Sequence, residues 1–350
     1  MVAAREQWIE QGIECELIAV GESVGEFATT LEACGYRIHQ LKPSRFSLLF
    51  GFFLLLLKRR PDVVHIHTER ASFWLALESR LLGRRVVQTI HNVFSFSGSL
   101  QRERKIQRRI SRNLGVTFVA VGTSVAQNEQ VQFDNNAQVI WNWVDLEKFS
   151  PPTRQQQDQA RQALGLTDDD FAVISVGNCW PEKNHSVIIE AMALETTPPH
   201  VVYLHVGDDS VGEGMQEHLL AENQSLTNRI RFLGTRSDVP QLLHAANLFL
   251  MPSAYEGLPI AAIEALATNL PVLLGDSPGL RDLHALADAI CLAKVDAPSF
   301  SSSIAEILLN SPIETPNFQS REIAELWFDP ARGVARYAEV YRNQPQGGPR

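Results

Sequence analysis

The chain has 350 residues, of which 45% are apolar and 8% aromatic, so it can build the cores of two ordinary domains. This composition excludes intrinsic disorder, collagen and a coiled coil. The net charge of −9 argues against a protein whose main partner is a nucleic acid. Residues 1–150 carry 18 basic and 15 acidic side chains, whereas residues 151–350 carry 13 and 25, which indicates that the two halves meet different partners.

Short apolar runs alternate with helical patterns along nearly the whole chain, which is typical of parallel sheets covered by helices. In the first half we expect strands at residues 15–20, 36–41, 63–66, 86–90, 118–121 and 138–141. In the second half we expect strands at 171–176, 201–206, 230–233, 248–251, 272–274 and 289–292. The alternation predicts two doubly wound Rossmann-like α/β domains. Because such sheets bind ligands at the carboxyl ends of their strands, we expect the active site in a cleft between the domains.

The start of the chain departs from this pattern. Residues 3–10 form a helix-like segment that ends at Gly12, where a doubly wound domain would open with a strand. That strand is normally central, so we expect two inner strands to lack a neighbour, and we interpret the start as truncated or misplaced. We predict a first domain at 1–149, a Pro- and Gln-rich linker at 150–165, a second domain at 166–328, a helix at 329–342 and a disordered tail at 343–350.

The cysteines and the longest apolar run bear on where the protein resides. Four cysteines lie far apart without C-x-x-C spacing, which predicts a reduced, cytoplasmic chain: Cys15, Cys34, Cys179 and Cys291. The longest apolar run, residues 46–57, is shorter than the roughly 20 residues needed to cross a bilayer. We expect a buried helix there, or alternatively an interfacial helix whose end carries Lys58, Arg59 and Arg60.

The first half also contains a basic run. Six cations fall within residues 102–112: Arg102, Arg104, Lys105, Arg108, Arg109 and Arg112. On a helix they form either an ordinary solvated face or a surface that binds anions, and the second interpretation predicts peripheral contact with an anionic membrane.

Segment 252–267, with the sequence PSAYEGLPIAAIEALA, holds the strongest local signal of a binding site. A predicted strand runs into a loop with Glu256 and Gly257, and a helix that carries Glu264 follows. Gly257 lets the backbone approach a ligand closely, and free N–H groups at the start of the helix favour a phosphate. As an alternative, Glu264 is a solvated helix residue and Glu256 interacts with the helix dipole.

Segment 171–185, with the sequence FAVISVGNCWPEKNH, holds the second signal. A strand, a glycine turn, a cation and a helix start are the parts of an anion cradle, in which Lys183 would offset the charge of a diphosphate. The dinucleotide motif G-x-G-x-x-G and the P-loop motif do not occur in the sequence, which disfavours nicotinamide and P-loop chemistry. The acidic run 168–170 indicates a solvated turn rather than a metal site, so we expect no metal and no cofactor.

These segments, together with IRFLGTR at 230–236 and VIWNWVD at 139–145, resemble a family 4 retaining glycosyltransferase of the GT-B fold over almost the entire chain. The resemblance implies two Rossmann-like domains facing a central cleft and a C-terminal helix that crosses back to the first domain. It implies metal-independent transfer of a hexose, with retention, from a UDP- or GDP-linked sugar to a glycan or lipid-linked glycan acceptor. A catalytically degenerate protein that binds nucleotide sugars and a GT-B epimerase remain alternatives.

By the same resemblance, three charged side chains would hold the nucleotide sugar. Glu264 would bind the ribose, Glu256 would hold the transferred sugar, and Lys183 would neutralise the diphosphate. Gly257 and Leu258 would offer backbone N–H groups near that diphosphate.

The resemblance also assigns residues around this centre. Gly177, Asn178 and Arg236 would complete the nucleotide-sugar site, although Asn178 stands where the family usually has an arginine, which predicts weaker diphosphate binding. From the first domain, His91 would contact the sugar, His67 is a weaker candidate, and His65 is more simply structural.

Overall fold

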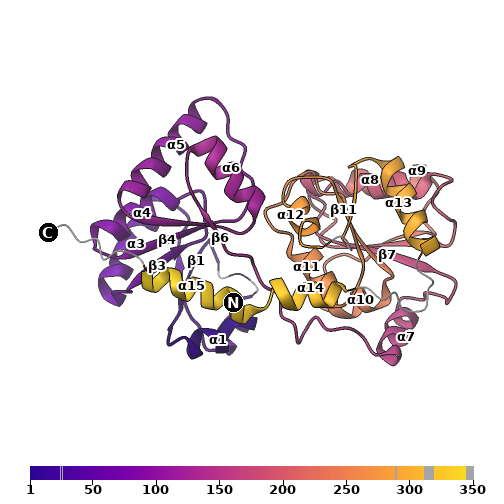
Figure 1. The fold of residues 1–350 in the computed structure, drawn as a ribbon, viewed down its shortest axis with the longest axis horizontal. Coiled ribbons are helices and arrows are strands. Elements are labelled where there is room, and N and C mark those ends of the chain that lie inside the picture. The colour runs from indigo at the N-terminus through magenta and orange to yellow at the C-terminus, as the bar shows by residue number, and fades with distance from the viewer. Residues whose placement is uncertain (24, 26, 288–289, 311–318, 344–350) are drawn as a thin grey trace. The chain divides into compact units, whose positions relative to one another are not determined.

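The computed structural model describes residues 1–23, 25, 27–287, 290–310 and 319–343. The chain divides into two compact units, which are described separately (Figure 1). Unit 1 comprises Met1–Asn142 and Pro330–Arg350, and unit 2 comprises Trp143–Asp329. The helix that the sequence placed at 329–342 therefore belongs to unit 1, where it forms α15 (Pro330–Asn343).

Unit 1 alternates helices with short strands, as the apolar runs predicted. Its elements before α15 are η1 (Val2–Ala4), α1 (Arg5–Glu10), β1 (Glu16–Val20), α2 (Ala28–Ala33), β2 (Arg37–Leu41), α3 (Arg45–Arg59), β3 (Val63–Ile66), α4 (Ser72–Leu81), β4 (Arg85–Ile90), α5 (Gly98–Asn113), β5 (Val116–Ala120), α6 (Thr123–Phe133) and β6 (Gln138–Val139). The buried residues of β4 and β5 form the centre of its core.

The strands of unit 1 form two separate parallel sheets. β1 pairs with β2, and a second sheet has the order β3-β4-β5-β6. Within the described residues, β1 and β2 have only each other as neighbours, and β3 and β6 are the edge strands of the four-stranded sheet. The helix predicted at the start of the chain is also present, and Trp8 of α1 stacks on Tyr341 of α15 with ring centroids 5.9 Å apart.

Unit 2 contains one parallel sheet with the order β12-β11-β10-β7-β8-β9. Its elements are α7 (Arg154–Ala163), β7 (Phe171–Val176), η2 (Pro181–Lys183), α8 (Ser186–Ala193), β8 (Val201–Val206), α9 (Gly214–Asn223), β9 (Ile230–Phe232), α10 (Val239–Ala245), β10 (Leu248–Met251), α11 (Ile260–Ala267), β11 (Val272–Gly275), α12 (Leu280–His284), β12 (Cys291–Ala293), α13 (Ala297–Asn310) and α14 (Ser320–Trp327). The central strands are buried on both faces, as expected for a doubly wound domain.

The segment that the sequence suggested as a linker, residues 150–165, instead contains helix α7. Thr153 and Gln156 form a capping box at its start, which satisfies N–H groups that a helix end leaves open. Arg161 is buried and donates hydrogen bonds to the carbonyl oxygens of Ala245, Thr167 and Asp170. The polar composition is therefore misleading, because one arginine anchors the helix to unit 2 through backbone acceptors.

Two further expectations concern the ends of the strands and of the chain. The strand predicted at 289–292 appears as β12, and its predicted first residue lies outside the described residues. The disordered tail predicted at 343–350 also lies outside them, apart from Asn343, which ends α15. Among the described residues, none of the helices has the length and hydropathy that crossing a bilayer requires.

Candidate active site

The two central strands of unit 2, β7 and β10, mark the point where the sheet changes direction. From β7 the chain proceeds through β8 and β9 on one side, and β10, β11 and β12 follow on the other. In doubly wound sheets, ligands bind at such a switch point, outside the carboxyl ends of the strands. The two loops that leave this point are residues 177–185 after β7 and 252–259 after β10.

Lys183 and Glu256 come together from these two loops. The Lys183 Nζ atom donates to Glu256 Oε1 at 2.7 Å, and the side chains are 24% and 14% exposed. The backbone N–H of Ala254 also donates to the carbonyl oxygen of Glu182 at 2.8 Å, which fastens one loop to the other. An ammonium group has three N–H bonds, so the ion pair leaves Lys183 the capacity to bind further oxygen atoms.

Close backbone packing shapes the loop that carries Glu256. The backbone N–H of Glu256 donates to the Pro278 carbonyl oxygen at 3.0 Å. Gly279 has a φ of +83°, and a Cβ at this position would lie 2.2 Å from the carbonyl oxygen of Glu256, so glycine is required here. Gly257 and Leu258 are buried in the same loop and lead into α11, whose N-terminus has no side-chain cap. Backbone N–H groups that could bind an anion thus lie next to Glu256 in the chain.

Glu264 lies in α11 between the buried residues Ile263 and Ala265. Desolvation raises the pKa of Glu264 to about 7, although the positive charge of Lys148 acts in the opposite direction. Within the described residues, its carboxyl group makes no ion pair or side-chain hydrogen bond. A partly buried carboxyl group without a partner and with a pKa near neutrality is typical of a functional position, since it costs stability.

Gly177 and Asn178 connect the loop after β7 to the loop after β8. The Gly177 N–H donates to the Val206 carbonyl oxygen at 2.8 Å, and Asn178 Oδ1 accepts from the Asp208 backbone N–H at 2.9 Å. The carbonyl of the Asn178 amide therefore holds the loop in place. A bond from Asn178 to a ligand would use its NH₂ group.

Arg236 lies in the loop after β9 and forms a two-point ion pair with Asp238, at 2.8 Å from Nε and 2.6 Å from Nη2. Both side chains are about 40% exposed. Within the described residues, Arg236 forms no hydrogen bond or ion pair with Lys183 or Glu256.

In unit 1, the predicted histidines form one cluster at the ends of β3 and β4. His67 Nδ1 and His91 Nε2 are hydrogen-bonded at 2.8 Å. The two residues that the sequence suggested as contacts of the sugar, His91 and the weaker candidate His67, are therefore joined by one N–H. Desolvation and the neighbouring His91 lower the pKa of His67 to about 4, and desolvation also lowers the pKa of His91. The lowered pKa values favour the neutral form of both rings, and a neutral imidazole can donate or accept a hydrogen bond.

His65 has the structural role that the sequence suggested. Its ring nitrogens are hydrogen-bonded to Tyr341 Oη and Thr89 Oγ1, each at 2.7 Å, and Thr89 in turn bonds Tyr337 Oη at 2.9 Å. Sequence reasoning missed both tyrosines, because α15 lies more than 240 residues away along the chain. No local pattern could have linked them to the histidines.

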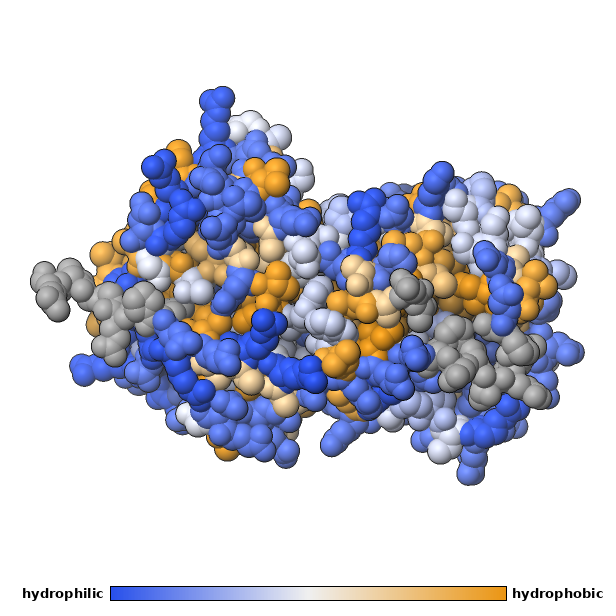
Figure 2. All heavy atoms as spheres, in the orientation of Figure 1, coloured by the Kyte–Doolittle hydropathy of each residue, from blue (hydrophilic) through white to orange (hydrophobic). Residues whose placement is uncertain are grey.

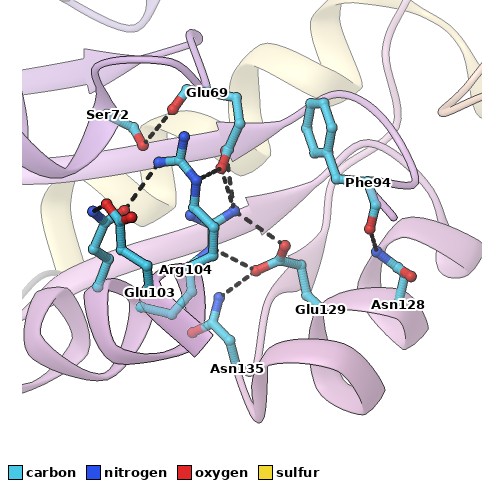
Figure 3. Close-up of polar contacts among 10 residues, drawn as sticks. Glu69, Ser72, Phe94, Glu103, Arg104, Asn128, Glu129 and Asn135 are labelled. Carbon is cyan, nitrogen blue, oxygen red and sulfur yellow. Dashed lines mark hydrogen bonds and ion pairs between the residues drawn. The ribbon is translucent and has the colours of Figure 1, made fainter. Parts of the chain in front are cut away.

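The basic run 102–112 forms most of α5, but it does not present all of its cations at the surface. Arg108 is 3% exposed and bonds Glu129 through Nε at 2.9 Å and Glu69 through Nη2 at 3.0 Å. Asn135 completes the network by donating to Glu129 at 2.8 Å (Figure 3). The interpretation of Arg108 as part of an anion-binding surface is therefore wrong, because buried carboxylates neutralise it. Arg102, Lys105, Arg109 and Arg112 are exposed.

The apolar run 46–57 forms most of α3, and it is buried on one face only. Leu48, Phe52 and Leu56 pack into unit 1. Large apolar side chains on the other face are exposed, among them Phe46, Phe50, Phe53, Leu54 and Leu57. Figure 2 shows apolar atoms at the edge of unit 1 where α3 and α4 lie. The prediction of a buried helix therefore holds for one face of α3 and not for the other.

Family models match both parts of the chain. The model for glycosyl transferases group 1 matches residues 156–323, and the model for glycosyltransferase family 4 matches residues 2–148. A UDP-Gal:alpha-D-GlcNAc-diphosphoundecaprenol alpha-1,3-galactosyltransferase of Escherichia coli is 30% identical over 245 residues, which are 66% of this chain and 62% of that protein. The putative glycosyltransferase EpsF of Bacillus subtilis (strain 168) is 28% identical over 62% of this chain and 58% of its own length. The chain thus spans about three fifths of these two relatives.

Solved structures agree with this chain over almost its full length. Anabaena HepE in complex with UDP and glucose superimposes with a TM-score of 0.80 at 21% identity, covering 97% of this chain and 95% of that chain. A glycosyltransferase from Rickettsia africae ESF-5 gives a TM-score of 0.83 at 18% identity, covering 99% and 94%. At such low identity the likeness establishes the fold, and the expected GT-B fold of two Rossmann-like units is confirmed.

Proposed function

The chain belongs to the family 4, group 1 glycosyltransferases, and on that premise we propose that it transfers a hexose from a nucleotide-diphosphate sugar to a glycan or lipid-linked glycan acceptor. The names of its relatives favour UDP as the nucleotide, since the E. coli enzyme uses UDP-Gal and HepE binds UDP. The E. coli enzyme acts on a diphosphoundecaprenol-linked sugar, which favours a lipid-linked acceptor. The observation that carries the proposal is the Lys183–Glu256 pair at the switch point of unit 2.

The charges in this site suit the cleavage of a sugar–diphosphate bond. As the bond breaks, negative charge develops on the leaving oxygen and positive charge on the anomeric carbon. The Lys183 ammonium and the backbone N–H groups at the start of α11 would stabilise the leaving diphosphate. Glu256, oriented by its hydrogen bond from Lys183, would accept hydrogen bonds from hydroxyl groups of the sugar, and Glu264 would do the same for the ribose.

We further propose that the reaction retains the configuration of the anomeric carbon. The acceptor hydroxyl would form its bond to this carbon on the face that the diphosphate leaves. Its proton would pass to the departing phosphate oxygen, so no enzyme nucleophile is needed. In unit 1, the His67–His91 pair has the capacity to donate or accept a hydrogen bond, as a contact with a sugar hydroxyl would require.

A bound metal is not needed for this mechanism, since Lys183 and backbone N–H groups supply the charge stabilisation. The acidic run 168–170 supports this proposal, because Asp170 Oδ2 accepts hydrogen bonds from the backbone N–H and the hydroxyl of Thr167, at 2.7 and 2.9 Å, as in a turn. Transfer rates with and without added Mg²⁺ or Mn²⁺ test this point, and we expect them to be equal.

The central experiment measures transfer from a panel of UDP- and GDP-sugars to lipid-linked and soluble glycan acceptors, with NMR of the product to read the anomeric configuration. Lys183→Ala and Glu256→Gln should each lower kcat/KM by about 10²- to 10³-fold, because each removes charge from the site. Lys294→Ala, which removes an exposed lysine of the same unit, should have no effect. Unchanged turnover in both site variants would refute the assignment.

The same panel separates the alternatives. Binding of a nucleotide sugar with no product on any acceptor would identify a degenerate binding protein. Conversion of the nucleotide sugar without an acceptor would identify an epimerase.

We also propose that unit 1 contacts the cytoplasmic face of an anionic membrane, where a lipid-linked acceptor would lie. The exposed apolar face of α3 includes Phe46 and Phe50, whose rings stack with centroids 6.1 Å apart. In its last turn Lys58 is exposed, whereas Arg59 is bonded to Glu16, so Lys58 is the cation that would meet an anionic surface.

Sedimentation with vesicles tests this proposal. Binding should require anionic lipid, and Phe50→Ser should reduce it at least about fivefold, since burial of a phenylalanine contributes about 1.5–3 kcal/mol. Leu309→Ser, which removes an exposed apolar side chain of unit 2, is the matched control. Equal binding of all three proteins would refute a role for α3.

A further inference from the structure

We propose that unit 2 binds one divalent metal ion, with Zn²⁺ as the best match, through Cys179, His185, His205 and Glu217. One candidate ligand atom of each residue lies within 4.8 Å of the others. These residues have no part in the transfer mechanism described above. The site would be structural and would lie behind the loop that carries Lys183.

Four different elements supply the four side chains. Cys179 follows β7, His185 caps α8, His205 lies in β8 and Glu217 lies in α9. β7 and β8 are neighbours in the sheet, and α8 packs against α9 (Figure 1). The cluster is therefore formed by parts of one compact unit.

All four side chains are buried, and their polar atoms lack sufficient partners. Their exposed fractions are 0% for Cys179, 3% for His185, 0% for His205 and 2% for Glu217. Three of their atoms are buried without a hydrogen-bond partner: His185 Nδ1, His205 Nδ1 and Glu217 Oε2. Native proteins seldom leave so many buried polar atoms unsatisfied in one place, because each costs about 1–3 kcal/mol. A metal ion that accepts electron pairs from several of these atoms at once would remove the cost of leaving them unsatisfied.

The charges of the cluster also favour a cation. Within the described residues, the Glu217 carboxylate has no lysine or arginine as an ion-pair partner. The ring of His185 faces it, with Nδ1 3.6 Å from Oε1, which is too long for a hydrogen bond. A thiolate, a carboxylate, two neutral imidazoles and a divalent ion together have no net charge. Such a group can be buried, whereas an isolated carboxylate is costly.

The spacing and chemistry of the ligands match zinc. A tetrahedral zinc site with bonds of about 2.0–2.3 Å places its ligand atoms roughly 3.3–3.8 Å apart, and small inward movements of these side chains would suffice. One sulfur, two nitrogen atoms and one oxygen suit a borderline ion such as Zn²⁺ better than Mg²⁺ or Ca²⁺. His205 Nε2 lies 3.0 Å from the Gly177 carbonyl oxygen and 3.6 Å from Cys179 Sγ, while Nδ1 has no hydrogen-bond partner, so the ring lies beside the thiol with one nitrogen unused.

Four protein ligands leave no open position for a reacting molecule, which is why we assign a structural role. The metal would fasten the loop 177–185 to β8 and α9. This loop contains Asn178 and Lys183, so the metal would hold the proposed diphosphate cradle in shape.

Metal analysis of the purified full-length chain tests the proposal directly. We expect about one zinc per chain after dialysis, removal of that zinc by a strong chelator with a fall of several degrees in Tm, and recovery of Tm on addition of Zn²⁺ alone. Less than about one tenth of an equivalent, with no change in Tm on addition of Zn²⁺, would overturn the inference.

Cobalt substitution identifies the ligands. In the chelated and Co²⁺-loaded protein, we expect the visible bands of tetrahedral Co²⁺ and a thiolate-to-cobalt charge-transfer band. Cys179→Ser should lose the charge-transfer band and the bound metal, whereas Cys291→Ser, the matched control, should keep both. A wild-type spectrum without these features, or the same metal content in Cys179→Ser, would overturn the assignment even if other variants failed to fold.

Discussion

Glu264→Gln is predicted to make the protein more stable at alkaline pH and to give no such gain at acidic pH. The substitution keeps the size of the side chain and removes its ability to ionise. In the wild type, desolvation raises the pKa of Glu264 from its ordinary value of 4.5 to about 7. The folded protein therefore holds this proton more tightly than the unfolded chain does.

The sign and size of the effect follow from this difference. Below pH 4.5 the carboxyl group is protonated in both states, and ionisation costs the folded state nothing. As the pH rises from 4.5 to about 7 only the unfolded chain loses the proton, so the wild type loses stability over this window. At about 1.4 kcal/mol per pKa unit the full loss above pH 7 is about 3 kcal/mol. Glutamine does not titrate, so its advantage should grow by that amount between pH 4 and pH 8.

Urea unfolding at a series of pH values measures this effect, with hydrogen exchange of the β10 and β11 amides as a probe of unit 2 alone. Glu190→Gln, which changes an exposed glutamate of the same unit, is the control and should follow the wild type at every pH. If the stability difference between Glu264→Gln and the wild type does not change with pH, Glu264 is not a desolvated carboxyl group. Its raised pKa would then no longer support a role in binding the ribose.

Two further predictions concern packing. Arg108→Met should destabilise unit 1 by about 3–5 kcal/mol, since it leaves the buried Glu129 carboxylate without its cationic partner. Arg109→Met, at an exposed position, should change stability by less than about 0.5 kcal/mol. Urea unfolding, monitored by hydrogen exchange of the β5 amides, measures both variants. Equal losses of stability in the two variants would contradict the buried network. Gly279→Ala should lower Tm and raise the KM for the nucleotide sugar, because its Cβ would strike the Glu256 carbonyl. Gly234 also has a positive φ, but a Cβ there would meet open space, so Gly234→Ala is the control. A similar response of both variants would show that backbone strain, and not the clash with Glu256, is responsible.

Much of the fold could be predicted because its determinants are local. The alternation of apolar runs and helical patterns placed every strand within two residues of its position in the structure, since a strand buried on both faces reads as a continuous apolar run. The sequence placed Lys183 and Glu256 in loops that follow two predicted strands. Because parallel strands end at the same edge of a sheet, the structure can join these loops through an ion pair.

Other features depended on contacts between distant parts of the chain. The basic run predicted a charged helix, but only the packing of α5 against Glu69 and Glu129 decided that Arg108 points inward. The polar segment 154–163 became a helix of unit 2 because backbone carbonyls elsewhere accept bonds from Arg161. The cluster of Cys179, His185, His205 and Glu217 has no signature in sequence spacing, because four separate elements bring it together. Local patterns in the sequence determined which elements form, whereas tertiary packing decided which polar groups lose contact with water, and burial controls their charge and chemistry.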